Sequence, residues 1–224
     1  MVYSRARMLG IRLEMNTPAR KLRKSAVKNI VRFPPVKANG GKSILVESIL
    51  ESKYCLYLEF DSSVETYFPQ PRTFTVSVGT ELRTYTPDFE VRDVTGGRKY
   101  VEVKPSGRAK EEHYQSLFTS FEASLEDSSA SFLLVDEIEI YRRPLLSNYE
   151  KLYQYRKRPT IDMRNLIRCA EGVNSGMPLS RLIAKLGNKA SLREIYSWIA
   201  LGHLTFEMHL EELTMSTEVR FDVH

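Results

Sequence analysis

Two acidic residues and a lysine flank a predicted β-hairpin near the middle of the 224-residue chain. Asp88 follows a proline before the first strand, and Glu102 and Lys104 end the second strand, after a turn at Gly96–Gly97. Because side chains alternate along a strand, all three fall on the face opposite the apolar residues. A turn centred on Gly96 predicts that position 88 lies across from 104, and position 90 from 102. Two carboxylates suit a hard divalent cation, and the ammonium can position a water or steady a phosphoryl oxygen.

An ordinary cross-strand ion pair on a surface hairpin is the simpler alternative. However, Pro87-Asp88 followed by Glu-x-Lys after a glycine turn resembles the motif of the restriction-endonuclease-like nucleases. A helix is predicted over residues 44–58 with Ser43 as its cap, and it contains two further acids, Glu47 and Glu51. These acids are one turn apart on the same helix face, so either could point toward the hairpin.

The elements around the hairpin predict an α/β fold with a central mixed sheet. Strands are expected at residues 64–68 and 73–78, and a polar helix with an apolar stripe is expected over residues 109–126. The continuous apolar run at residues 131–135 is typical of a strand buried on both faces. Helix, mixed sheet, helix and buried strand is the layout of a restriction-endonuclease-like core. We therefore expect a catalytic domain over residues 43–142.

The sequence pattern over residues 143–224 predicts a second domain, which is mostly helical. Helices are expected at residues 148–157, 160–172, 178–186 and 191–200, with a strand pair at 204–208 and 217–221. A helix-turn-helix followed by a strand pair favours a winged-helix-like domain. The helix that would enter the DNA groove carries the basic Arg193 next to the acidic Glu194. The sequence therefore does not decide whether this domain binds DNA or a protein.

The charge distribution predicts a basic N-terminal arm over residues 1–42. That segment holds eleven Lys or Arg and one acid, whereas the rest of the chain holds 22 basic and 27 acidic residues. Such an arm suits the DNA backbone, although a partner protein or plain solvation are alternatives. No apolar run reaches 18 residues and the first residues lack a secretory signal pattern, so we expect no membrane contact. Cys55 and Cys169 indicate buried free thiols in a reducing compartment.

The stretch from Glu47 to Lys104 resembles the TnsA family of endonucleases, which work with a DDE transposase in cut-and-paste transposition. The segments that carry the resemblance are residues 47–51, 58–64, Pro69-Gln70-Pro71, Tyr85-Thr86-Pro87-Asp88-Phe89 and Val101-Glu102-Val103-Lys104-Pro105. A looser likeness continues to residue 221 and includes the winged-helix region.

The resemblance implies roles for the candidate residues. The helix acid of the family stands eight residues before the Glu of a Leu-Glu-aromatic element, which implies Glu51 and leaves Glu47 as the alternative. Asp88 matches the metal-binding Asp, Lys104 matches the catalytic Lys, and Glu102 holds a position where the family has Glu or Gln. The catalytic set is then Glu51, Asp88, Glu102 and Lys104, with one or two Mg²⁺ ions, or Mn²⁺ as a substitute, held by the three acids. Whether Gln70 touches this site is open.

The implied activity is Mg²⁺-dependent hydrolysis of DNA at the 5′ ends of a transposon, on the non-transferred strand. The implied partners are double-stranded transposon ends, a DDE-type transposase subunit and an AAA+ transposition regulator, in the bacterial cytoplasm at the nucleoid. Two other functions stay open. One is a stand-alone restriction or repair nuclease, and the other is a non-catalytic DNA-binding assembly module.

Overall fold

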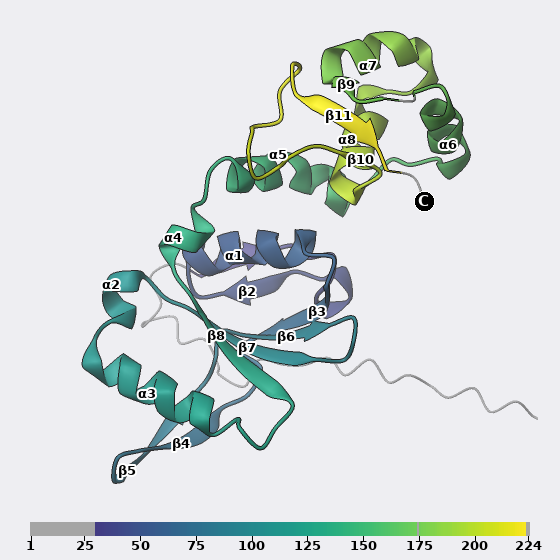
Figure 1. The fold of residues 1–224 in the computed structure, drawn as a ribbon. Coiled ribbons are helices and arrows are strands. Elements are labelled where there is room, and N and C mark those ends of the chain that lie inside the picture. The colour runs from purple at the N-terminus through teal and green to yellow at the C-terminus, as the bar shows by residue number, and fades with distance from the viewer. Residues whose placement is uncertain (1–29, 174, 223–224) are drawn as a thin grey trace, which may run out of the picture.

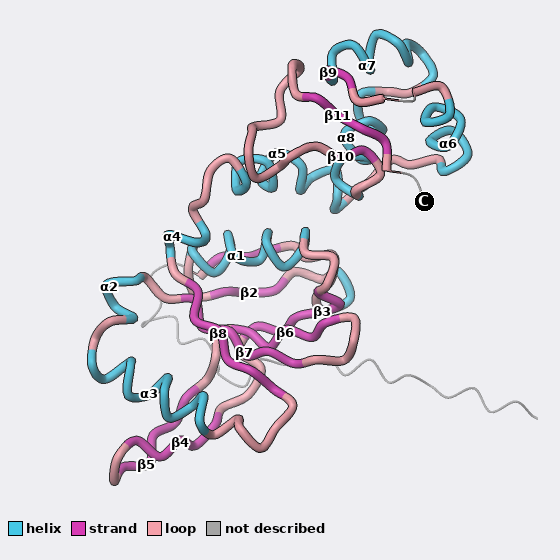
Figure 2. Tube along the Cα trace, viewed as in Figure 1, coloured by secondary structure: helices cyan, strands magenta, loops and turns pink. Residues whose placement is uncertain are grey.

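A computed structural model describes residues 30–173 and 175–222. Most of the expected basic arm, residues 1–29, lies outside the described residues. The described chain is mixed α/β and forms two lobes, joined through helix α5 (Leu145–Lys157) (Figure 1). The lower lobe holds the predicted site, and the upper lobe is mostly helical (Figure 2). Within the described residues, no helix combines the length and the apolar character that a bilayer crossing requires.

The lower lobe is built on a mixed four-stranded sheet. The strands, in their order across the sheet, are β3 (Val64–Pro69), β6 (Phe89–Asp93), β7 (Arg98–Val103) and β8 (Ala130–Val135). The pairs β3–β6 and β6–β7 are antiparallel, whereas β7 and β8 are parallel. The predicted mixed sheet is therefore confirmed, and so is the hairpin that carries the candidate residues.

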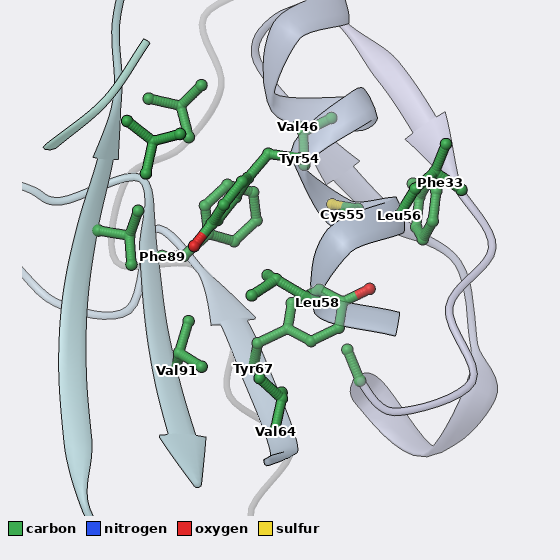
Figure 3. Close-up of a cluster of buried hydrophobic side chains, with 14 of the residues drawn as sticks. Phe33, Val46, Tyr54, Cys55, Leu56, Leu58, Val64, Tyr67, Phe89 and Val91 are labelled. Atoms are coloured by element: carbon green, nitrogen blue, oxygen red, sulfur yellow. The ribbon is translucent and has the colours of Figure 1, made fainter. Parts of the chain in front are cut away.

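Helix α1 (Ile49–Phe60) covers one face of the sheet. Tyr54 and Leu58 of this helix pack toward Phe89 and Val91 of β6 (Figure 3). The prediction that this helix begins at residue 44 is wrong. Ser48 is the N-cap, since its hydroxyl accepts the Glu51 backbone N–H at 3.0 Å.

The residues just before α1 form a strand. Strand β2 (Ile44–Val46) pairs with β1 (Val31–Phe33), and its two end residues are buried whereas the middle one is exposed. That alternation has the period of a strand, which explains why no helix forms here. A 3₁₀ turn (Asn39–Gly41) lies between the two strands. Residues 30–42, the end of the expected arm, thus pack into the lower lobe.

Helix α3 (Glu112–Ala123) and the hairpin of β4 (Phe74–Val78) and β5 (Glu81–Tyr85) cover the opposite face (Figure 1). The predicted apolar stripe is confirmed, because its aromatic members pack on Tyr85 and Tyr100. The helix predicted over residues 109–126 is α3, which is shorter at both ends, and a separate short helix, α2 (Ser106–Ala109), precedes it because Glu111 has extended dihedrals.

Strand β8 is the edge strand of the sheet, so the prediction of burial on both faces is wrong. Leu133 and Leu134 are each 37% exposed. Within the described residues β8 pairs with β7 alone. Its outer edge therefore has no neighbouring strand among these residues to cover it, and an apolar run in the sequence does not reveal this. Helix α4 (Glu137–Ile140) follows and leads into the upper lobe.

The upper lobe contains the predicted helices and strand pair. Its elements after α5 are α6 (Met163–Glu171), β9 (Met177–Pro178), α7 (Leu179–Leu186), a 3₁₀ turn (Gly187–Lys189), α8 (Leu192–Leu201), β10 (Leu204–Thr205) and β11 (Glu218–Phe221). The three short strands form an antiparallel sheet in the order β10-β11-β9. Trp198 of α8 is fully buried in the hydrophobic core of this lobe. Cys55 and Cys169 are both buried and free, as predicted.

Candidate active site

Asp88 and Lys104 lie at the same end of the β6–β7 hairpin, because one precedes β6 and the other follows β7. Phe89 pairs with Val101, so Asp88 stands across from Glu102 rather than from Lys104. The backbone N–H of Val103 donates to Asp88 Oδ2 at 2.8 Å. The hairpin thus brings the predicted residues together, with its predicted register in error by two residues.

The turn explains the register error. The Asp93 carboxylate accepts the backbone N–H groups of Thr95 and Gly97, at 2.8 and 2.9 Å, which centres the loop on Thr95 instead of Gly96. Gly96 closes the loop at φ 89°, a left-handed conformation that glycine adopts without strain. A two-residue shift keeps the alternation of faces, so the prediction of which side chains share a face survives.

Glu102 is buried and held on both carboxylate oxygens. Its Oε1 accepts from the Lys104 ammonium, and its Oε2 accepts from the Tyr85 hydroxyl at 2.9 Å. The Lys104 Nζ also lies 4.0 Å from the centre of the Tyr114 ring, in a cation–π contact. Strand β5 and helix α3 therefore fix the positions of the two Glu-x-Lys side chains.

Sequence reasoning missed Tyr85 and Tyr114 as parts of the site. The position of Tyr85, three residues before Asp88, was a usable signal. Tyr114 belongs to an apolar stripe at helical spacing, which is typical of core residues, so nothing in the sequence marks it.

Glu51 is fixed at the N-terminus of α1. Its Oε2 accepts the Glu47 backbone N–H at 2.9 Å, and its Oε1 accepts the Ser48 hydroxyl at 2.8 Å. The side chain is only 4% exposed. These contacts resemble those of a helix-capping residue, yet they also hold the carboxylate in one place. Glu47, the alternative acid, contributes its backbone N–H to this arrangement.

Electrostatic interactions link Glu51 to the hairpin acids. Burial raises the pKa of Glu51 to about 6, although the two hydrogen bonds lower it, and the charges of Glu47 and Glu102 raise it further. Burial, followed by the charges of Glu102 and Glu51, raises the pKa of Asp88 well above its usual range. Carboxylates that raise each other's pKa are stabilised when a cation binds among them.

The carboxylates differ in their freedom to accept a cation. Within residues 30–173 and 175–222, no three His, Cys, Asp or Glu side chains form a ready-made metal-binding group. Asp88 Oδ1 accepts no hydrogen bond from any described residue, whereas both oxygens of Glu102 and both oxygens of Glu51 are engaged. Oxygen donors of this kind fit Mg²⁺ or Mn²⁺. Asp88 has an oxygen that no described residue bonds, and the partners of Glu51 are a neutral N–H and a neutral hydroxyl, whereas Glu102 is paired with the Lys104 ammonium. The contacts therefore favour Asp88 and Glu51 as donors over Glu102.

Comparison with models of known protein families finds none that matches the chain. Comparison with curated proteins likewise finds no match.

Proposed function

We propose that the chain is a metal-dependent DNA endonuclease that cuts the 5′ ends of a transposon as the TnsA-like subunit of a transposase. The observation that carries this proposal is that the buried Glu51 interacts electrostatically with Asp88 and Glu102 of the hairpin. An ion pair on a surface hairpin needs no buried acid from a separate helix. A nuclease site needs such an acid, because carboxylates from several elements hold the metal.

The arrangement of elements supports the same proposal. An antiparallel β3-β6-β7 sheet with a parallel β8, and helices on both faces, fits a restriction-endonuclease-like core. In the upper lobe, the chain order from α6 to β11 is helix, strand, helix, helix, strand, strand. This order, with β11 between β9 and β10, fits a winged-helix domain.

The side chains divide the work of phosphodiester hydrolysis. Asp88 and Glu51 would hold Mg²⁺, which acts as a Lewis acid and lowers the pKa of a bound water. Lys104, held between Glu102 and Tyr114, would place its positive charge beside the phosphate as charge develops there. The Val103 N–H keeps Asp88 in place before the substrate arrives.

We propose that the upper lobe binds a protein, such as the AAA+ regulator, rather than reading DNA. Helix α8 would be the recognition helix, but five of its ten residues are buried. Its Arg193 is engaged by the Arg158 carbonyl at 2.9 Å and the Thr160 hydroxyl at 3.0 Å. Helix α6 instead exposes Met163 and Ile167, which are 46% and 45% exposed and suit an apolar protein contact.

A strand-specific cleavage assay tests the nuclease proposal. The substrate is a transposon-end duplex in Mg²⁺, with and without the cognate DDE transposase, and the products are mapped on each strand. Asp88→Asn should abolish cleavage of the non-transferred strand, whereas Asp127→Asn, which alters an exposed acid in the turn after α3, should leave it unchanged. Normal cleavage by Asp88→Asn would refute the site. Efficient cutting without the transposase would instead indicate a stand-alone nuclease.

Calorimetric titration with Mn²⁺ separates the enzyme from an inert assembly module. The wild type should bind Mn²⁺, and Asp88→Asn should lose this binding while Asp127→Asn keeps it. A wild type that binds no Mn²⁺ and cuts no DNA would favour the non-catalytic module.

A further inference from the structure

Gln70 is buried next to Asp88, and none of the residues that the structure describes forms a hydrogen bond with its side chain. It is 3% exposed, and neither Nε2 nor Oε1 has a hydrogen-bond partner among the described residues. Its backbone N–H donates to the Asp88 carbonyl at 2.8 Å. Buried polar groups in native proteins are nearly always paired, so an unpaired carboxamide at this place requires an explanation.

The backbone at Gln70 is also strained. Its φ is +42°, and the only other non-glycine residue with a positive φ in residues 30–173 and 175–222 is Asn39, a residue type that tolerates this conformation. Pro71 follows and further restricts the conformation of Gln70. Strain of this kind persists where the surrounding structure imposes it, and it is concentrated at functional sites.

The sheet places this residue at the end where the candidate site lies. Pro69, the last residue of β3, pairs with Phe89 of β6, so Gln70, the residue after the strand, stands beside Asp88. A carboxamide provides two N–H donors and carries no charge. It can therefore bind a phosphate oxygen without adding to the negative charge of Glu51, Asp88 and Glu102.

We infer that Gln70 is a further substrate-binding residue whose carboxamide donates a hydrogen bond to a phosphate oxygen of the bound DNA strand. The inference rests on the proposed nuclease function, and it assigns to the site a residue outside the metal and Glu-x-Lys set. The positive φ of Gln70 fixes the direction in which its backbone leaves β3 beside Asp88.

The variant Gln70→Met tests this role, because methionine has a similar length and no polar group. Removing a buried group that has no partner should leave the urea midpoint of the full chain unchanged or raise it. Cleavage of the transposon-end duplex, in complex with the transposase, should fall about ten- to hundredfold, as expected for a lost hydrogen bond to a charged group. Gln154→Met is the matched control, since Gln154 is exposed on α5, and it should change neither quantity.

Two outcomes overturn the inference. A lower urea midpoint for Gln70→Met would mean that the carboxamide has partners in the free protein, a buried water included. Unchanged cleavage at an unchanged midpoint would mean that it does not bind substrate. In both cases the loss of cleavage in Asp88→Asn would still uphold the nuclease.

Binding measured without cleavage keeps the two proposals distinct. Fluorescence anisotropy of the labelled transposon-end duplex is recorded with the same complex in Ca²⁺, which need not support cutting. Weaker binding by Gln70→Met than by Gln154→Met would uphold the role of Gln70, even if the wild type never cuts DNA in Mg²⁺. Equal binding by the two variants would overturn it.

Discussion

Replacing Glu51 with Gln should stabilise the protein at neutral pH and remove its activity. The carboxylate is buried and lies in the field of other acids, so its ionised form is unfavourable in the folded state. Glutamine has the same shape and remains neutral. A site that holds its acids together for a cation is therefore expected to be less stable than its neutral variant when no cation is bound.

The size of the effect follows from the pKa of Glu51. Folding raises this pKa from 4.5 to about 6. Between these two values the folded state holds more protons than the unfolded state, so the wild type loses stability as the pH rises through this window. At about 1.36 kcal/mol per pKa unit, the loss is about 2 kcal/mol and is complete above pH ~6. The stability of Glu51→Gln relative to the wild type should therefore increase by about 2 kcal/mol between pH 4 and pH 7.5.

Urea unfolding of both proteins at pH 4, 5, 6 and 7.5, without divalent cations, measures this difference. Glu65→Gln, which changes an exposed acid of β3, should show no comparable dependence on pH. A pH-independent difference between Glu51→Gln and the wild type would refute the argument that burial and neighbouring acids raise the pKa of Glu51.

Added Mg²⁺ should reverse the order of stability at pH 7.5. A cation that binds only the folded wild type at one hundred times its dissociation constant stabilises it by about 2.7 kcal/mol. Glu51→Gln lacks one of the two proposed donors and should gain much less. An equal gain in both proteins would show that Glu51 does not hold the cation.

Three further substitutions test the surroundings of the site and the link between the lobes. Tyr85→Phe should lower the free energy of urea unfolding by about 1–3 kcal/mol, because Glu102 loses its buried hydroxyl partner; an unchanged value would contradict this contact. Tyr114→Leu should slow cleavage about fivefold, equivalent to about 1 kcal/mol, because the Lys104 ammonium loses its cation–π contact; an unaltered rate would argue against a positioning role. Leu152→Ala should lower the free energy of unfolding by about 2–5 kcal/mol, and fluorescence and circular dichroism should follow one shared transition.

The sequence predicted local elements well and their boundaries less well. Alternation along the β6–β7 hairpin identified which residues share a face, since this depends only on the period of a strand. The register depended on the Asp93 carboxylate, which binds the turn and moves its centre. The start of α1 was misplaced because Ser43 and Ser48 both suit an N-cap, and only the pairing of β1 with β2 distinguishes them.

Contacts between distant segments were the part that the sequence did not predict. Asp88, Glu102 and Lys104 are close in sequence, so a hairpin alone gathers them. The electrostatic interaction of Glu51 with these residues depends on how α1 packs on the sheet. The sequence pattern alone could not decide whether Glu51 or Glu47 is the helix acid of the site. The burial of Gln70 without partners is a property of packing, and no pattern in the sequence indicates it.

Helix α5 belongs to both hydrophobic cores. Its Leu146 packs in the core of the lower lobe, whereas Leu152, less than two turns later, packs in the core of the upper lobe. Near the C-terminus of α1, the Phe60 ring stacks on Tyr149 with 4.4 Å between ring centres and 5° between planes.

This shared helix decides how the chain can be divided. A cut near residue 143, the domain boundary expected from the sequence, would remove Leu146 and Tyr149 from the lower lobe and expose apolar surface on α1. A fragment meant to carry the nuclease-like lobe alone would have to continue to Lys157. The face of α5 that packs in the upper lobe, including Leu152, would then be exposed to solvent. This face would need polar substitutions to prevent aggregation. The two lobes thus depend on the same helix, because α5 supplies side chains to both hydrophobic cores.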